Sequence, residues 1–232
     1  MSKKECVKLL ALFALALGLL GFSVFLKHPR SSLSWSGEVY CIEDVNDFDA
    51  KLARPYNKAL DDFADCVALL TNLIAILPCA LVFLKSEDKK SAFKVAACDA
   101  FSFGLCWLYA GSVYRILKTL AGRIRPYMYF ENPSAKGIAE GDFCRSWPSG
   151  HSAAVFIAFA FLLGCFVWRK ANSKYKKPLL CAAFFLCVLT MILRMLSGNH
   201  FLTDVLSGAV IGFATSFGVF ALLQTKVFVE KA

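Results

Sequence analysis

A serine, a glycine and a histidine stand together where a long apolar stretch begins. Pro148 precedes Ser149, Gly150 and His151. Serine is a favoured helix N-cap, and glycine lets the backbone approach a ligand closely. A helix N-terminus carries unpaired N–H groups that favour anions, phosphate above all. His151 at this position can act as a base, or as a proton donor once phosphate is bound.

A second histidine lies four residues before an aspartate, at the start of the last apolar stretch. His200 and Asp204 share one helix face if that helix begins by His200. The carboxylate would then fix the tautomer of the imidazole and leave the other ring nitrogen as a nucleophile. The alternative interpretation is a purely structural hydrogen bond.

Three cations lie at the ends of apolar stretches. Lys118 and Arg125 lie at the end of one of them, seven positions apart, and Arg194 lies near the end of another. Cations at such places bind phosphoryl oxygens well. The alternative is that these cations only extend from a membrane span to the polar interface and bind no ligand.

The elements that must position these residues are membrane spans. The chain has 232 residues, of which 58% are hydrophobic and only 19% are charged. About 20 apolar residues in a helix cross a bilayer, and the sequence predicts six such helices, at 7–26, 63–84, 95–117, 151–168, 179–196 and 203–225. The first is longer than the apolar part of a signal peptide and lacks a cleavage site before Lys27, so we expect it to be retained. The fold class is therefore an all-α, six-transmembrane-helix bundle forming a single domain over 1–232.

Charge is sorted between the two sides of the membrane. The N-terminal segment, 85–94, 169–178 and the C-terminal segment together hold 14 basic and four acidic residues, whereas loop 27–62 holds five basic and seven acidic residues. The positive-inside rule places both termini in the cytoplasm. Most of the net charge of +9 is then an orientation signal, and it does not indicate a nucleic-acid partner. Because successive spans alternate in direction, the histidines, the cations and Asp204 all fall on the extracytoplasmic face.

Loop 27–62 also has apolar residues at helical spacing. Apolar and aromatic residues recur there at steps of three or four: Val45, Phe48, Leu52, Tyr56, Leu60 and Phe63. Pro55 fits a break between two short helices. This pattern is typical of an interfacial helical segment on the outer surface of the bilayer. A packed connector explains it equally well.

Together these residues resemble the signature of the type-2 phosphatidic acid phosphatase superfamily, which reads Lys-x6-Arg-Pro, then Pro-Ser-Gly-His, then Ser-Arg-x5-His-x3-Asp. In this chain the motifs are Lys118-x6-Arg125-Pro126, Pro148-Ser149-Gly150-His151 and Leu193-Arg194-x5-His200-x3-Asp204. Leu193 replaces the family serine, which would remove one phosphate contact. The strings 121–127 and 200–204 are similar to the bacterial branch that contains lipid A phosphatases.

The resemblance implies a metal-independent phosphatase that works through a phosphohistidine. His200 would be the nucleophile, oriented by Asp204, and His151 would be the general acid and base. The phosphoryl group would be held by Lys118, Arg125, Arg194 and the backbone N–H groups of Ser149 and Gly150. No Cys/His spacing or carboxylate cluster in the sequence indicates a metal site, and no cofactor is expected.

The expected substrate is a lipid phosphate, because the site lies at the interface beside Tyr127, Tyr129, Phe130 and Trp147. These aromatic residues are either lipid contacts or ordinary anchors at the headgroup level. Lipid A 1-phosphate in a bacterial inner membrane is one candidate; undecaprenyl pyrophosphate, phosphatidylglycerophosphate and transfer to a lipid acceptor are others. A six-span transporter is the alternative from another class, but it would carry polar or broken helices at mid-membrane.

Two cysteines lie in the predicted outer loops. Cys41 and Cys144 are placed where an oxidising compartment would allow a disulfide between loop 27–62 and the loop before Ser149. The sequence gives no distance between them, so the bond and the free thiols both remain possible.

Overall fold

The computed structural model describes residues 3–27, 40–168 and 175–223. Six helices in these ranges are long and apolar enough to cross a membrane. They are α1 (Lys3–Phe25), α3 (Lys58–Lys85), α4 (Lys89–Ala121), α6 (Gly150–Trp168), α7 (Lys176–Leu196) and α8 (Leu202–Leu222). The predicted six-span, all-α architecture is confirmed, and the chain is a multi-pass membrane protein.

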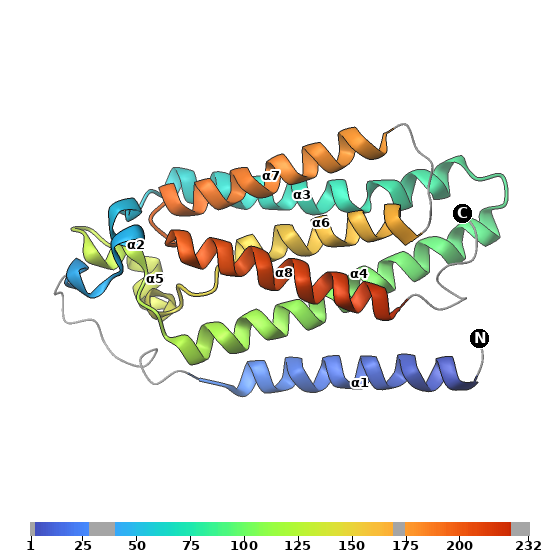
Figure 1. The fold of residues 1–232 in the computed structure, drawn as a ribbon, viewed down its shortest axis with the longest axis horizontal. Helices are drawn as coiled ribbons and strands as arrows, with labels where there is room; N and C mark the ends of the chain where they lie inside the picture. The colour runs from blue at the N-terminus through green and yellow to red at the C-terminus, as the bar shows by residue number, and fades with distance from the viewer. Residues whose placement is uncertain (1–2, 28–39, 169–174, 224–232) are drawn as a thin grey trace.

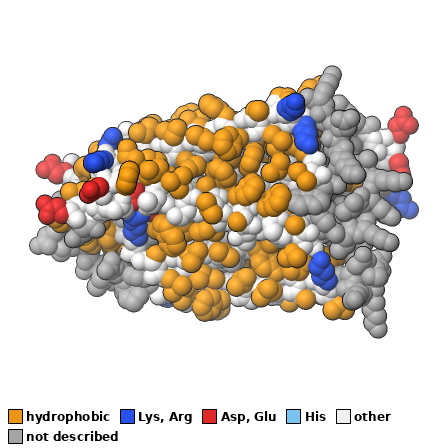
Figure 2. Space-filling view, viewed as in Figure 1, with side chains coloured by type: hydrophobic (Ala, Val, Ile, Leu, Met, Phe, Trp, Pro, Cys, Tyr) orange, Lys and Arg blue, Asp and Glu red, His pale blue; other side chains and the backbone are white. Residues whose placement is uncertain are grey.

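The helices lie side by side in an elongated bundle (Figure 1). The short elements between the long helices gather at one end: the helices α2 (Asp47–Leu52) and α5 (Ala135–Ala139) with the 3₁₀ turns η2 (Ile42–Asp44), η3 (Pro126–Tyr129) and η4 (Asp142–Cys144). Hydrophobic side chains cover the middle of the face seen in Figure 2, and charged side chains lie toward its two ends. This distribution fits a bundle whose centre lies in lipid and whose ends reach water.

Several span boundaries differ from the sequence prediction, and the third span differs at both ends. The third span begins at Lys89 and ends at Ala121, several residues beyond 95–117 at each end. Its start is capped by the Asp88 side chain, which accepts hydrogen bonds from the N–H groups of Lys90 and Ser91. Its end is a left-handed cap at Gly122, with φ of 56°. Hydropathy missed these turns because capping groups, rather than apolar residues, fix the helix ends.

Helix α6 lies at the centre of the bundle, where it contacts α3, α4, α7 and α8. The closest approach is to α8. A Cβ atom on Gly208 would lie 2.3 Å from the Ser149 carbonyl oxygen, and one on Gly212 would lie 2.3 Å from that of Ala153. These two glycines therefore let the beginnings of α6 and α8 meet, which brings His151 and His200 to the same end of the bundle, called here the histidine end.

Loop 27–62 is described from residue 40 onward, and there its helix α2 packs on the bundle while Phe48 and Leu52 are exposed. Helix α2 is followed by an irregular stretch through Pro55, and the residues after it form the first turn of α3. Asp49 of α2 is fully buried and accepts hydrogen bonds from Arg123 at 2.8 Å and from the Thr203 hydroxyl at 2.6 Å. These contacts hold α2 on the first turn of α8. Burial by itself would raise the pKa of Asp49. The hydrogen bonds that its carboxylate accepts from Thr203, Arg123 and Asn46 outweigh burial and keep this pKa below its ordinary value.

The loop before α6 has a small core of its own. Tyr127, Met128 and Phe143 are almost completely buried and pack together. Tyr127 is therefore part of this core and not an anchor at the headgroup level, which was one of the two roles considered from the sequence. Cys144 is also buried here, its thiol donating to the Gly141 carbonyl at 3.5 Å, while Cys41 is exposed, and no disulfide joins the two.

Candidate active site

The predicted site residues converge on one open cavity of about 610 Å³ at the histidine end. Lys118, Arg125, Gly150, His151 and His200 all line it. Arg194 lines an adjoining cavity of about 180 Å³, which shares His151 with the first. Ser149 and Asp204 are fully buried beneath these surfaces. Residues from α4, α6, α7 and the turn before α8 thus meet within one small region.

His200 is poised as a neutral imidazole. It lies on the non-helical turn between α7 and α8, with 2% of its surface exposed. Burial lowers the pKa of His200 well below its ordinary value, and the positive charges of Arg125 and Lys118 lower it further. A neutral ring keeps an electron pair available for attack on an electrophile.

Asp204 does not hydrogen-bond His200 in this structure. Its Oδ2 lies 3.7 Å from Nδ1 of His200, and that nitrogen has no hydrogen-bond partner. Helix α8 begins at Leu202, so His200 is outside the helix and the four-residue spacing does not stack the two side chains. Asp204 instead accepts hydrogen bonds from the Ser146 hydroxyl at 2.5 Å and from Arg123 at 2.6 Å. It thereby fixes the start of α8 and the loop before α6 against each other.

Arg125 is held rigidly at the wall of the cavity. Its Nε donates to the Asp142 carbonyl at 2.9 Å, one Nη donates to the Asn199 side chain at 2.9 Å, and the other pairs with the Asp142 carboxylate. Burial alone would raise the pKa of Asp142, but the charges of Arg125 and Lys118 hold it below its ordinary value, so this carboxylate is ionised. Lys118, in the last turn of α4, is 7% exposed.

Two acidic residues that the sequence analysis did not single out also reach the site. Asp65 of α3 accepts a hydrogen bond at 2.8 Å from Nε2 of His151. Asp61, one turn earlier, pairs with Arg194, whose Nη1 also lies 3.6 Å from Asp65. Asp61 was counted only among the acidic residues of loop 27–62, and Asp65 falls within the predicted span 63–84. Nothing in their spacing relates them to His151 or Arg194.

The start of α6 agrees only in part with the sequence prediction. The Ser149 hydroxyl accepts from the Ser152 N–H at 3.3 Å, which is the predicted N-cap. The Ser149 N–H, however, donates to the Asp204 carbonyl at 3.0 Å and is therefore not offered to a ligand. Gly150 does line the cavity. Leu193, which stands in the place of the family serine, packs against Ala64 and Val67 in an apolar cluster.

Arg145 is a further cation in the cavity wall that the sequence analysis missed. Its Nε is buried and has no hydrogen-bond partner. The available signal was a basic residue four positions before Ser149. Four cations, Arg115, Lys118, Arg125 and Arg145, face this cavity against two carboxylates, Asp65 and Asp142. The excess of positive charge favours an anionic ligand.

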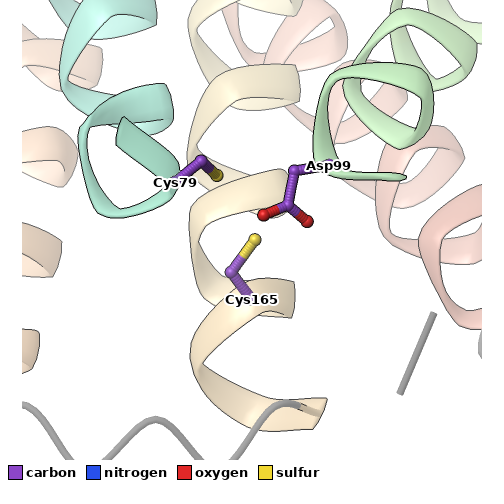
Figure 3. A group of neighbouring side chains, drawn as sticks. All are labelled: Cys79, Asp99 and Cys165. Atoms are coloured by element: carbon purple, nitrogen blue, oxygen red, sulfur yellow. The ribbon is translucent and has the colours of Figure 1, made fainter. Parts of the chain in front are cut away.

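A separate group of metal-ligand side chains lies toward the opposite end of the bundle. Cys79, Asp99 and Cys165 point toward one another from α3, α4 and α6, with ligand atoms all within 4.8 Å (Figure 3). Sequence spacing did not indicate this group because each residue comes from a different helix. Two thiolates and a carboxylate around a divalent ion would leave net negative charge in the apolar interior, which is costly. We assign no metal to it.

Six apolar helices that bring two imidazoles and several buried cations to one end define a membrane protein with an anion-binding site. A model of the PAP2 superfamily matches residues 99–228, more than half of the chain. The chain belongs to this superfamily, and it is thereby assigned to the phosphatases. No curated protein and no solved structure is found to match it. The superfamily resemblance seen in the motifs is confirmed, and the match begins within α4, so α1, α2 and α3 lie outside it.

Replacing Arg145 by glutamine is expected to weaken substrate binding. The buried Nε has no protein partner that would explain its position, so a phosphoryl oxygen is the partner we expect. Loss of one hydrogen bond to a charged group should raise KM about tenfold, with a smaller change in kcat. Steady-state release of inorganic phosphate measures both constants. Lys51→Gln, at an exposed position on α2, is the matched control, and an unchanged KM for Arg145→Gln would remove Arg145 from the site.

Proposed function

We propose that the protein hydrolyses a phosphate ester of a lipid at the cavity of the histidine end, through a phosphohistidine and without a metal ion. An imidazole nitrogen of His200 attacks phosphorus and forms an N–P bond while the P–O bond to the lipid breaks. His151 gives its proton to the leaving oxygen. Water then attacks phosphorus, His151 takes a proton from it, and the N–P bond breaks to release inorganic phosphate and free His200.

The charges around the cavity support this reaction. Lys118 and Arg125 would face the phosphoryl oxygens, and the positive charge stabilises the transferring group where its bonds are weakest. The buried neutral ring of His200 suits the nucleophile. The 3.7 Å gap to Asp204 suits a hydrogen bond that tightens when substrate binds, as happens in many enzymes.

The shape of the cavity is the observation that supports a lipid as the substrate. From the histidines it continues along α3 and α4, where Ala68, Leu69 and Asn72 face Tyr114 and Trp107. Trp107 and Lys118 are eleven positions apart on α4, which is about 16 Å along a helix. Leu69 is 63% exposed, so this part of the cavity has an apolar, open side. Such a groove would hold an acyl or prenyl chain in the bilayer while its phosphate reaches His200.

We further propose that the histidine end faces the extracytoplasmic side of a bacterial cytoplasmic membrane. The support is the distribution of charge, since the segments at the other end of the spans are rich in lysine and arginine. The candidate substrates are lipid A 1-phosphate, undecaprenyl pyrophosphate, phosphatidylglycerophosphate and phosphatidic acid. The same phosphohistidine would also allow transfer to a lipid acceptor.

A panel of phosphate esters tests the lipid assignment. The purified protein in detergent micelles is assayed for phosphate release from these four lipids and from glycerol 3-phosphate, with EDTA present because the proposed chemistry needs no metal. At least one lipid should give a kcat/KM about 100-fold above that of glycerol 3-phosphate, because the groove binds only the lipid chain. Equal turnover of the soluble ester would contradict a lipid substrate, and loss of all activity in EDTA would contradict the metal-free mechanism.

A further inference from the structure

The outer turns of α3 carry an acidic pair directed at the candidate site. Asp61 and Asp65 are one helical turn apart, and α3 packs against both α6 and α7. The superfamily match covers residues 99–228, so it assigns no role to either residue. Each nevertheless contacts a different residue of the matched motifs.

The two carboxylates divide these contacts between them. Asp61 pairs with Arg194 and also accepts a hydrogen bond from the Tyr56 hydroxyl at 3.0 Å. Because Asp61 already balances the charge of Arg194, Asp65 is left for His151. Its Oδ1 lies 2.8 Å from His151 Nε2, the shorter of its two contacts, against 3.6 Å to Arg194. Asp65 is 60% exposed, so this bond is made at the edge of the cavity and not in the helix core.

The bond fixes which nitrogen of His151 faces the substrate. With Nε2–H donated to Asp65, Nδ1 is the nitrogen left for proton transfer. A carboxylate on the far side of an imidazole also stabilises the imidazolium form, as in the aspartate–histidine pair of serine proteases. This matters at a site where Arg194 from α7, Lys118 from α4 and Arg125 from the following loop all oppose a further positive charge.

We propose that Asp65 is a positioning residue that orients His151 and stabilises its protonated form as the general acid for the leaving oxygen. This inference rests on the proposed function. It extends the site to α3, so that the same helix lines the groove for the lipid chain and supports the acid that releases the lipid.

Two substrates with different leaving groups distinguish a role in protonation from a purely structural role of Asp65. An alkyl leaving group, as in phosphatidic acid, needs a proton as the P–O bond breaks, whereas p-nitrophenolate leaves without one. Asp65→Asn should therefore lower the single-turnover rate of P–O cleavage about 10- to 100-fold for the lipid and less than about threefold for p-nitrophenyl phosphate. For the lipid, KM should stay close to that of the unchanged protein.

Controls separate this inference from its alternatives. Asp62→Asn, on the same helix but exposed and paired with Lys58, should match the unchanged protein on both substrates. The thermal transition in detergent checks that Asp65→Asn is folded. Equal losses on the two substrates, or no loss on either, would overturn the role of Asp65 while leaving the proposed function intact. Turnover by His200→Ala would instead overturn the proposed function itself.

Discussion

Replacement of His200 by alanine is expected to reduce phosphate release to the background rate while the protein remains folded. If the imidazole of His200 forms the N–P bond, alanine removes the nucleophile, and a loss of at least about 10⁴-fold in kcat is expected. The fold should survive because Nδ1 of His200 has no hydrogen-bond partner whose loss would leave a buried group unsatisfied. Phosphate release from the best lipid of the panel measures the effect.

Trapping the phosphorylated protein makes this prediction more specific. The unchanged protein, quenched during turnover of a ³²P-labelled lipid, should carry label that is lost in acid and stable in base, as expected for a phosphohistidine. His200→Ala should carry none, and Lys51→Gln should be labelled normally. Substantial turnover by His200→Ala, or label on it at another residue, would disprove the proposed nucleophile.

Replacement of His151 by alanine is expected to slow both halves of the reaction without preventing the first. General acid and base assistance is worth about 10² to 10⁴ in rate, so kcat for a lipid phosphate should fall by that factor. With p-nitrophenyl phosphate the first half needs no acid, whereas the second half still needs a base for water. His151→Ala should therefore release one burst of p-nitrophenolate per protein and then accumulate the phosphorylated form.

This pattern distinguishes His151 from both His200 and Asp65. His200→Ala should show no burst, and Asp65→Asn should show a burst followed by turnover faster than that of His151→Ala. Rapid-quench kinetics on the aryl substrate, with thermal transitions as a check of folding, resolves the three cases. Absence of the burst in His151→Ala would show that His151 is needed for binding or for the nucleophilic step.

The sequence by itself determined the six spans and the family. A bilayer requires about 20 apolar residues from each helix, so composition along the chain is enough to locate the spans to within a few residues. The motif residues were also evident because the cations, the two histidines and the helix start before His151 occur at spacings that distinguish the family. Their convergence at one end follows from the alternation of the spans.

Only the tertiary structure decided how these residues are held. The crossing of α6 and α8 at Gly208 and Gly212 sets which side chains meet, and no local pattern encodes that register. Asp204 is turned toward Ser146 and Arg123 because α8 begins after His200. Asp65 reaches His151 because α3 packs beside α6, a contact between residues 86 positions apart. Charged side chains in a membrane bundle take their partners from neighbouring helices, so spacing along one helix cannot identify those partners.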